Sequence, residues 1–250
     1  LVGSEMCIRD RMYNESSRCM IEKWDVNCTE HPQVCGAALA LQREYEFMAA
    51  ACMDKFMLKT DRRVTKMMLK GYEQDKAANA PQPKYRCLVW ACPAHYYTNF
   101  TYWTQHCWGV TCVNDMEAML SYQPITIGDK EQALADLVRC YEKMMMRSHT
   151  NGGYVNLLDE CWKMCEKFHT NIVIMYDHVS CKNVGGLHGL FEDQARERGI
   201  HLIWIPHDVM DPRTVSRREM REAFSQYMVT VLNEKPLDPT LLDYEDALSW

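Results

Sequence analysis

One cysteine is better placed for a chemical role than the others because of the residues around it. Cys181 follows an apolar run at residues 171–176 and directly precedes Lys182 and a helix start that contains two glycines. A neighbouring ammonium group and the positive end of a helix dipole both stabilise a thiolate. Cys181 is therefore a candidate nucleophile or metal ligand, and the alternative is a loop cysteine without a role.

Polar residues also follow the other apolar runs. Cys92 ends the first run, Asn114 follows the second, and an acidic loop follows the last. His207 or Asp208 could orient a ligand, whereas Cys92 is more typical of a half-buried packing residue. Asp211, which precedes a proline, is typical of a turn. The candidates for a substrate cleft are Cys92, Asn114, Lys182, His207 and Asp208.

Two further patterns have a chemical and a structural interpretation. Cys161 and Cys165 lie one helical turn apart and could bind a metal, but their helical surroundings favour packing in the core. The other cysteine spacings do not match a structural zinc site. The aromatic residues between 96 and 103 could line an acyl or nucleotide pocket, or could simply pack a helix on the edge of a sheet.

The elements that must position these residues alternate along the chain. Short apolar runs separated by helical patterns are typical of a parallel sheet wrapped by helices, and ligands bind such sheets at the carboxyl ends of the strands. We therefore predict an α/β fold with a parallel, Rossmann- or flavodoxin-like sheet flanked by helices and preceded by a helical segment. The predicted strands are 86–91, 110–113, 171–176 and 201–205, and the predicted helices are 100–107, 129–146, 154–168, 185–198 and 216–232.

The chain divides into four predicted segments. The first eleven residues look like a translated sequencing adapter, so we expect them to pack against nothing, and we expect the chain to be a fragment that lacks its true N-terminus. Residues 12–36 show no clear period and are predicted to be irregular, whereas 37–78 have a helical composition. The segments are 1–11 as an artefact, 12–83 as a mostly helical part with a linker, 84–232 as the α/β domain and 233–250 as a tail.

Composition limits the class of protein. The net charge is -6, which gives no support to nucleic-acid binding. No apolar run approaches the ~20 residues that span a bilayer, and the N-terminal region has no signal-peptide core. The chain has 13 cysteines, several within helical patterns, which fits a reducing compartment better than a disulfide scaffold. We therefore expect a cytoplasmic protein that binds neither nucleic acid nor membrane.

An ordered set of motifs surrounds Cys181. The set comprises Ser180-Cys181-Lys182, Gly186, Gly199-Ile200, the run LIWIPHD, Asp211-Pro212-Arg213 and Arg221-Glu222-Ala223-Phe224. In order and spacing it resembles the C-terminal domain of the 2-hydroxyacyl-CoA dehydratase and benzoyl-CoA reductase family, which includes the D-component of 2-hydroxyglutaryl-CoA dehydratase. A weaker similarity upstream extends the resemblance over residues 84–232. The chain departs from the family pattern at Val179, His201, Met220 and Gln226.

The resemblance implies a function that the residues alone do not. Family members are subunits of heterodimeric enzymes in which cysteines hold a [4Fe–4S] cluster. A separate ATP-dependent iron–sulfur activator supplies an electron, which the cluster passes to an acyl-CoA thioester. By position, Cys181 matches the cluster ligand of the C-terminal domain. The other ligands are expected from an N-terminal domain, because the surroundings of Cys19, Cys28 and Cys35 do not resemble the family's motifs.

Two alternatives remain open at this stage. The chain could be a non-catalytic companion subunit, or a binding module, that kept the fold and lost the cluster; further cysteines in a preceding domain would favour the enzyme instead. It could also be a thiol-dependent transferase in which Cys181 is the nucleophile, with His178 or His207 as its base. The catalytic residues are not identified. In the cluster hypothesis, the sulfur of Cys181 should point into an open cleft.

Overall fold

The structure is a computed structural model that describes residues 2–35, 55–94, 96–116, 124–143 and 145–243. The chain forms two compact units. The first unit comprises residues 1–33, 42–81 and 118–157, and the second comprises 34–41, 82–117 and 158–250. Residues 118–157 lie inside the range predicted as one α/β domain, but they cluster with the helical unit.

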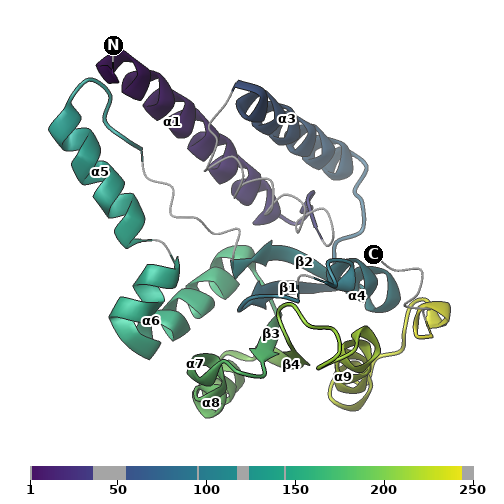
Figure 1. Cartoon of the computed structure of the whole chain (residues 1–250). Helices are drawn as coiled ribbons and strands as arrows, with labels where there is room; N and C mark the ends of the chain where they lie inside the picture. The colour runs from purple at the N-terminus through teal and green to yellow at the C-terminus, as the bar shows by residue number, and fades with distance from the viewer. Residues whose placement is uncertain (1, 36–54, 95, 117–123, 144, 244–250) are drawn as a thin grey trace. The chain divides into compact units, whose positions relative to one another are not determined.

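The second unit contains the predicted parallel sheet. Its strands are β1 (Tyr85–Trp90), β2 (Val110–Asp115), β3 (Ile172–His178) and β4 (His201–His207), in the order β2-β1-β3-β4. All three neighbouring pairs are parallel. The α/β prediction is therefore confirmed, and β2, β3 and β4 each continue beyond their predicted ends (Figure 1).

Aromatic packing holds two helices on one face of this sheet. Helix α4 (Phe100–Trp108) and helix α9 (Arg217–Thr230) contribute rings to a shared cluster with β3. The ring of Phe100 lies 6.1 Å from that of Tyr176 and 5.8 Å from that of Phe224, and both pairs meet edge to face. Such pairs add about 0.5–1.5 kcal/mol beyond the burial of area. Phe100 and Trp103 therefore serve the core, whereas Tyr102 is exposed.

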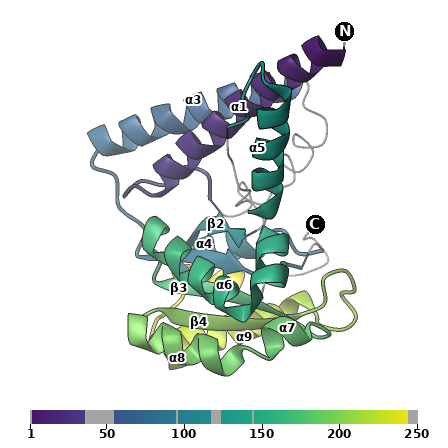
Figure 2. The same cartoon turned by 90° about the vertical axis from the view of Figure 1, so that its left-hand side faces the viewer.

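Helices on the opposite face pack around Trp204. Successive strand residues point to opposite faces, so Trp204 faces away from Ile205. Its ring stacks on His188 at 3.5 Å, and the neighbouring ring of Phe191 meets Trp162 at 5.7 Å. These residues come from helix α8 (His188–Arg198) and from the later half of helix α6 (Met145–Phe168). Figure 2 shows β4 between α8 and α9.

Several predicted helix ends are confirmed. Asp129 caps helix α5 (Lys130–Glu142) by accepting hydrogen bonds from two backbone amides, and Gly199 ends α8 with a φ of 66°. Between the predicted helices 129–146 and 154–168, Gly153, with a φ of 71°, interrupts α6. Part of the predicted tail packs on α4, since the Trp103 indole donates to the carbonyl of Leu241 at 2.9 Å.

The first unit contains a helix where the sequence predicted irregular structure. Helix α1 (Val2–Asn27) and helix α3 (Lys55–Ala77) run in the same direction, because Glu15 of α1 pairs with Arg62 while His31, just after α1, meets Tyr72 further along α3. The prediction for residues 12–36 was wrong for the part within α1. Its buried face includes polar side chains, which erase the apolar period; they are Ser16, Ser17, Lys23 and Asn27.

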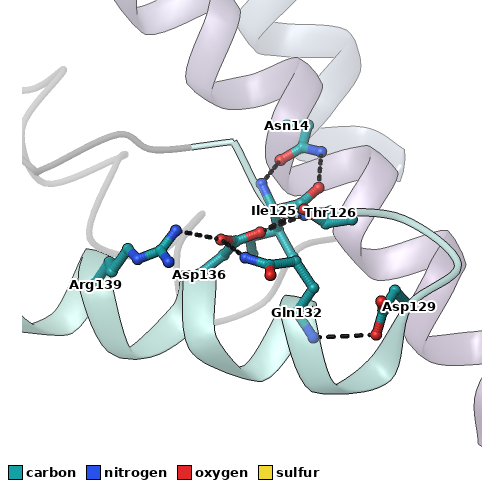
Figure 3. A network of polar contacts seen from close by, with 7 residues as sticks. All are labelled: Asn14, Ile125, Thr126, Asp129, Gln132, Asp136 and Arg139. Atoms are coloured by element: carbon teal, nitrogen blue, oxygen red, sulfur yellow. Dashed lines mark hydrogen bonds and ion pairs between the residues drawn. The ribbon is translucent and has the colours of Figure 1, made fainter.

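A polar network fixes the segment before α5 to α1. The Asn14 amide donates to the carbonyl of Ile125 and accepts from its N–H, both at 2.8 Å (Figure 3). The Asp136 carboxylate accepts from the backbone and hydroxyl of Thr126 at 2.8 and 2.7 Å, and from Gln132 at 2.9 Å. These contacts supply hydrogen-bond partners for backbone groups of a short irregular segment that pairs with no strand.

The expectation for the first eleven residues remains a prediction. Residues 2–11 belong to α1, and none of the side chains described at positions 8–11 is buried. Ile8 is 51% exposed. Among the helices of the described ranges, none is long and apolar enough to cross a bilayer.

Candidate functional site

The candidate site lies in the second unit, at the carboxyl edge of its sheet. Cys92 follows β1, Asn114 lies in the last part of β2, Cys181 follows β3, and His207 ends β4. Because the strands are parallel, their carboxyl ends share one edge, which is where ligands bind this class of fold. The topology therefore brings together the loops that the sequence singled out.

Cys181 lies in a tight connection between β3 and the next helix. Its N–H donates to the carbonyl of His178 at 2.8 Å, and its own carbonyl accepts from Gly185 at 3.1 Å. The side chain is half-buried and the adjacent Lys182 is exposed. The predicted helix 185–198 is split, because α7 (Lys182–Gly185) is a single turn that ends before α8 begins. Cys181 therefore precedes a much smaller helix dipole than the sequence suggested.

His207 is the buried polar residue of this edge. Its ring is fully buried, 5.0 Å from the ring of Tyr176 and 5.5 Å from that of His178. Neither ring nitrogen makes a well-formed hydrogen bond to any described residue. Burial lowers the pKa of His207, although the backbone carbonyls of Cys92 and Asp177 act in the opposite direction. His207 is therefore a neutral imidazole beside the Cys92 loop.

The acidic loop after β4 is held by its own carboxylates. The Asp208 side chain accepts from the amides of Met210 and Asp211, both at 2.9 Å, and these two hydrogen bonds lower its pKa. The Asp211 carboxylate pairs with the Arg213 guanidinium at 2.6 Å, which lowers the pKa of Asp211 to about 2. The turn interpretation of Asp211 therefore agrees with the structure, and Asp208 has a structural role of its own.

Asn114 stands slightly apart from this group, whereas Cys92 lies beside it. Asn114 is 1% exposed and lies opposite Leu88, well before the end of β1. Its side-chain oxygen accepts from the Asp115 amide at 2.9 Å, while its side-chain nitrogen has no described partner. The half-buried Cys92 directs its thiol toward the carbonyl of Pro93 at 3.9 Å, a weak contact. The structure therefore groups His207, Asp208 and the Cys92 loop, with Asn114 deeper along the sheet.

Two side chains tie the β1 loop to the β4 loop, and sequence reasoning had not given them this role. The Tyr96 hydroxyl donates to the carbonyl of Val215 at 2.8 Å, and the Arg217 guanidinium donates to the carbonyl of Tyr96 at 2.8 Å. Burial raises the pKa of Tyr96, and the carboxylates of Asp208 and Asp211 add to this effect. The aromatic residues near 96 were noticed in the sequence, but their partners lie more than a hundred residues away.

The described residues alone do not complete a metal site or a catalytic thiol. They contain no group of three or more histidine, cysteine, aspartate or glutamate side chains that could hold a metal ion. Within the same ranges, no hydrogen bond joins the Cys181 sulfur to a histidine: His178 contacts Ser180 at 3.1 Å and the carbonyl of His207 at 3.4 Å. A thiol nucleophile needs an adjacent base, so the transferase hypothesis gains no support.

The sheet and its edge define the class: a parallel α/β protein with polar loops gathered at the carboxyl ends of the strands. A comparison with protein families then identifies its place. The model for 2-hydroxyglutaryl-CoA dehydratase, D-component, matches residues 11–228, so the chain belongs to this family of dehydratase subunits. A search of curated proteins found no match. The family match begins at residue 11, so it also includes the helical segment that the resemblance at 84–232 left out.

Proposed function

We propose that this chain is a subunit of an iron–sulfur enzyme that acts on an acyl-CoA thioester, with Cys181 as one ligand of a [4Fe–4S] cluster. The observation that carries the proposal is the family match over residues 11–228 together with a half-buried cysteine at the carboxyl edge. Cluster ligation requires a cysteine thiolate that is reachable from outside the core. Cys181 satisfies this better than the cysteines buried in the sheet, Cys87 and Cys112.

The proposal requires ligands beyond those described. A [4Fe–4S] cluster takes four thiolate ligands, and the described residues contain no group of three ligating side chains. The remaining ligands would come from outside the described ranges, and a homologous second subunit would complete the enzyme. The cluster supplies a low-potential electron when it is bound, and an ATP-dependent iron–sulfur activator would reduce it.

The chain's own residues would prepare the edge for the thioester. His207 is neutral and buried, so it can donate one hydrogen bond without bringing a charge. A thioester carbonyl is an acceptor that suits such a donor. Exposed Lys182 lies next to Cys181 and offers a cation to the phosphates of a coenzyme A moiety. The tether from Tyr96 to Val215 would keep the two flanking loops in place.

One observation favours a second function. Because no group of three ligands exists in the described part of the chain, a companion subunit that kept the fold without a cluster also fits. Such a subunit would still present the exposed Lys182 to a partner's substrate. It would bind no iron under any conditions of reconstitution.

Anaerobic reconstitution separates the two functions. The wild-type chain, Cys181→Ala and a matched control, Cys140→Ala, would be incubated with iron and sulfide, both with and without the second subunit. Cys140 is a buried cysteine in the other unit, so it controls for the loss of any thiol. We expect iron, sulfide and visible absorption to fall sharply in Cys181→Ala only. Equal cluster content in both variants would remove Cys181 as a ligand, and an iron-free wild type would favour the companion subunit.

A further inference from the structure

A cavity opens at the edge of the sheet opposite to the candidate site. It has a volume of about 630 Å³ and lies where α6 and α8 end and where β3 and β4 begin. Lys163, Glu166 and His169 at its rim are exposed, so the cavity is accessible to solvent. Trp162 and Cys165 form part of its lining, and Arg198 adds a positive charge.

The cysteine pair of α6 lies at this cavity. Cys161 and Cys165 are one helical turn apart, so their side chains share a face of the helix. Cys161 is 0% and Cys165 is 2% exposed, and Cys165 lines the cavity. Cys165 therefore lies beneath the open space, with Cys161 one helical turn away, and both thiols are shielded from bulk solvent.

The surroundings make Cys165 the more acidic thiol of the pair. The pKa of Cys165 is lowered chiefly by a hydrogen bond from Cys161, and Thr170 and Arg198 add to this against the effect of burial. Burial instead raises the pKa of Cys161. Cys165 thus loses its proton first, and Cys161 keeps its proton until a metal ion displaces it.

The spacing decides between three kinds of chemistry for two thiols. Side chains four residues apart on a helix have Cβ atoms about 5–6 Å apart, whereas a disulfide needs about 3.5–4.5 Å. A disulfide would therefore distort the helix. Structural zinc takes four ligands, and no third ligand converges on this pair among the described residues. A two-coordinate ion that bridges two sulfurs fits the spacing and the ligand count, and thiolates select soft ions such as monovalent copper.

We propose that Cys161 and Cys165 form a two-coordinate thiolate site for a soft monovalent cation, reached through the cavity. Binding forms two metal–sulfur bonds and releases the two thiol protons to solvent, with no change in oxidation state. The resulting site carries one negative charge, which Arg198 at the cavity wall offsets. This site is separate from Cys181 and does not depend on the proposed function.

Anaerobic titration with monovalent copper against a competing chelator tests the site. The proteins are the wild-type chain, Cys161→Ala, Cys165→Ala and the control Cys140→Ala, and all four retain Cys181. We expect each of the two α6 variants to lose one tightly held copper equivalent, while the control keeps it. Equal copper retention in all four proteins would overturn the proposal, whatever the outcome of the iron reconstitution.

A second measurement covers the case in which the alanine variants fail to fold. Phenylarsine oxide condenses with two neighbouring thiols and releases one water, so its arsenic bridges them. Mass spectrometry of the digested wild-type chain should find the adduct on the peptide that contains both Cys161 and Cys165, and preloading with copper should block it. Adducts confined to other cysteines would count against a paired site.

Discussion

Replacing His207 with leucine should stabilise the second unit. The ring is fully buried, and both of its nitrogens lack a well-formed hydrogen bond to described residues. A buried polar group without a partner costs about 1–3 kcal/mol. The leucine variant also gives up the edge-to-face pairing with the Tyr176 ring, which is worth about 0.5–1.5 kcal/mol. The backbone carbonyls of Cys92 and Asp177 lie close enough to the ring to offset part of this cost, so we expect a net gain of only about 1 kcal/mol in the free energy of unfolding.

The gain from His207→Leu should depend on pH in a defined direction. The folded-state pKa of His207 is lowered, mainly by burial, so the unfolded chain takes up the proton at a higher pH than the folded chain. The free energy of unfolding of the wild type therefore falls as the pH drops below about 6.5, the ordinary histidine pKa. The fall ends below the folded-state pKa. Since leucine has no proton to bind, the advantage of the variant should widen on acidification.

Urea denaturation at about pH 8 and about pH 5 measures both effects, and the slope m shows whether the unfolded states are comparable. His106→Leu, at an exposed position on α4, is the control for the loss of a histidine. In the enzyme hypothesis, His207→Leu should also bind acyl-CoA more weakly although it is more stable. A variant that is less stable than the wild type at the higher pH, with the same pH dependence, would refute the reasoning, because the ring would then have partners in solution.

Three further changes test other parts of the structure. Asp61→Ala removes the carboxylate that lies 2.8 Å from the buried ammonium of Lys23 and should reduce the free energy of unfolding by about 3–5 kcal/mol. The control Asp193→Ala breaks an exposed ion pair and should change the free energy of unfolding by less than about 1 kcal/mol. Equal effects of the two variants in urea denaturation would contradict the buried pair. Ser216→Ala removes the capping box of α9 and should lower the stability by about 1 kcal/mol, and an unchanged urea midpoint would argue against the cap. Gly199→Ala, at a φ of 66°, should lower the thermal midpoint, and an unchanged or raised midpoint would show that this position tolerates a side chain.

The sequence by itself determined the α/β class and the position of Cys181 within it. Each strand is a short run of apolar residues, and the residues around it are local signals for helix starts and ends, as at Asp129 and Gly199. Such signals act over a few residues, so they can be read along the chain. The loop location of Cys181 after β3 followed from the same reasoning, and the family motifs around it were recognisable in order.

The features that depend on contacts between residues far apart in the chain were decided only by the tertiary structure. Helix α1 buries Lys23 against Asp61 of α3. Because a buried lysine interrupts the apolar pattern of the helix, the sequence of α1 alone did not reveal its buried face. The loop after β1 reaches past β3 so that Cys92 lies beside His207, and burial there, not sequence, makes the imidazole neutral. The cavity over Cys165 likewise arises from the meeting of two helix ends and two strand starts. Burial and partner choice depend on residues far apart in the chain, so they are fixed only when the elements pack.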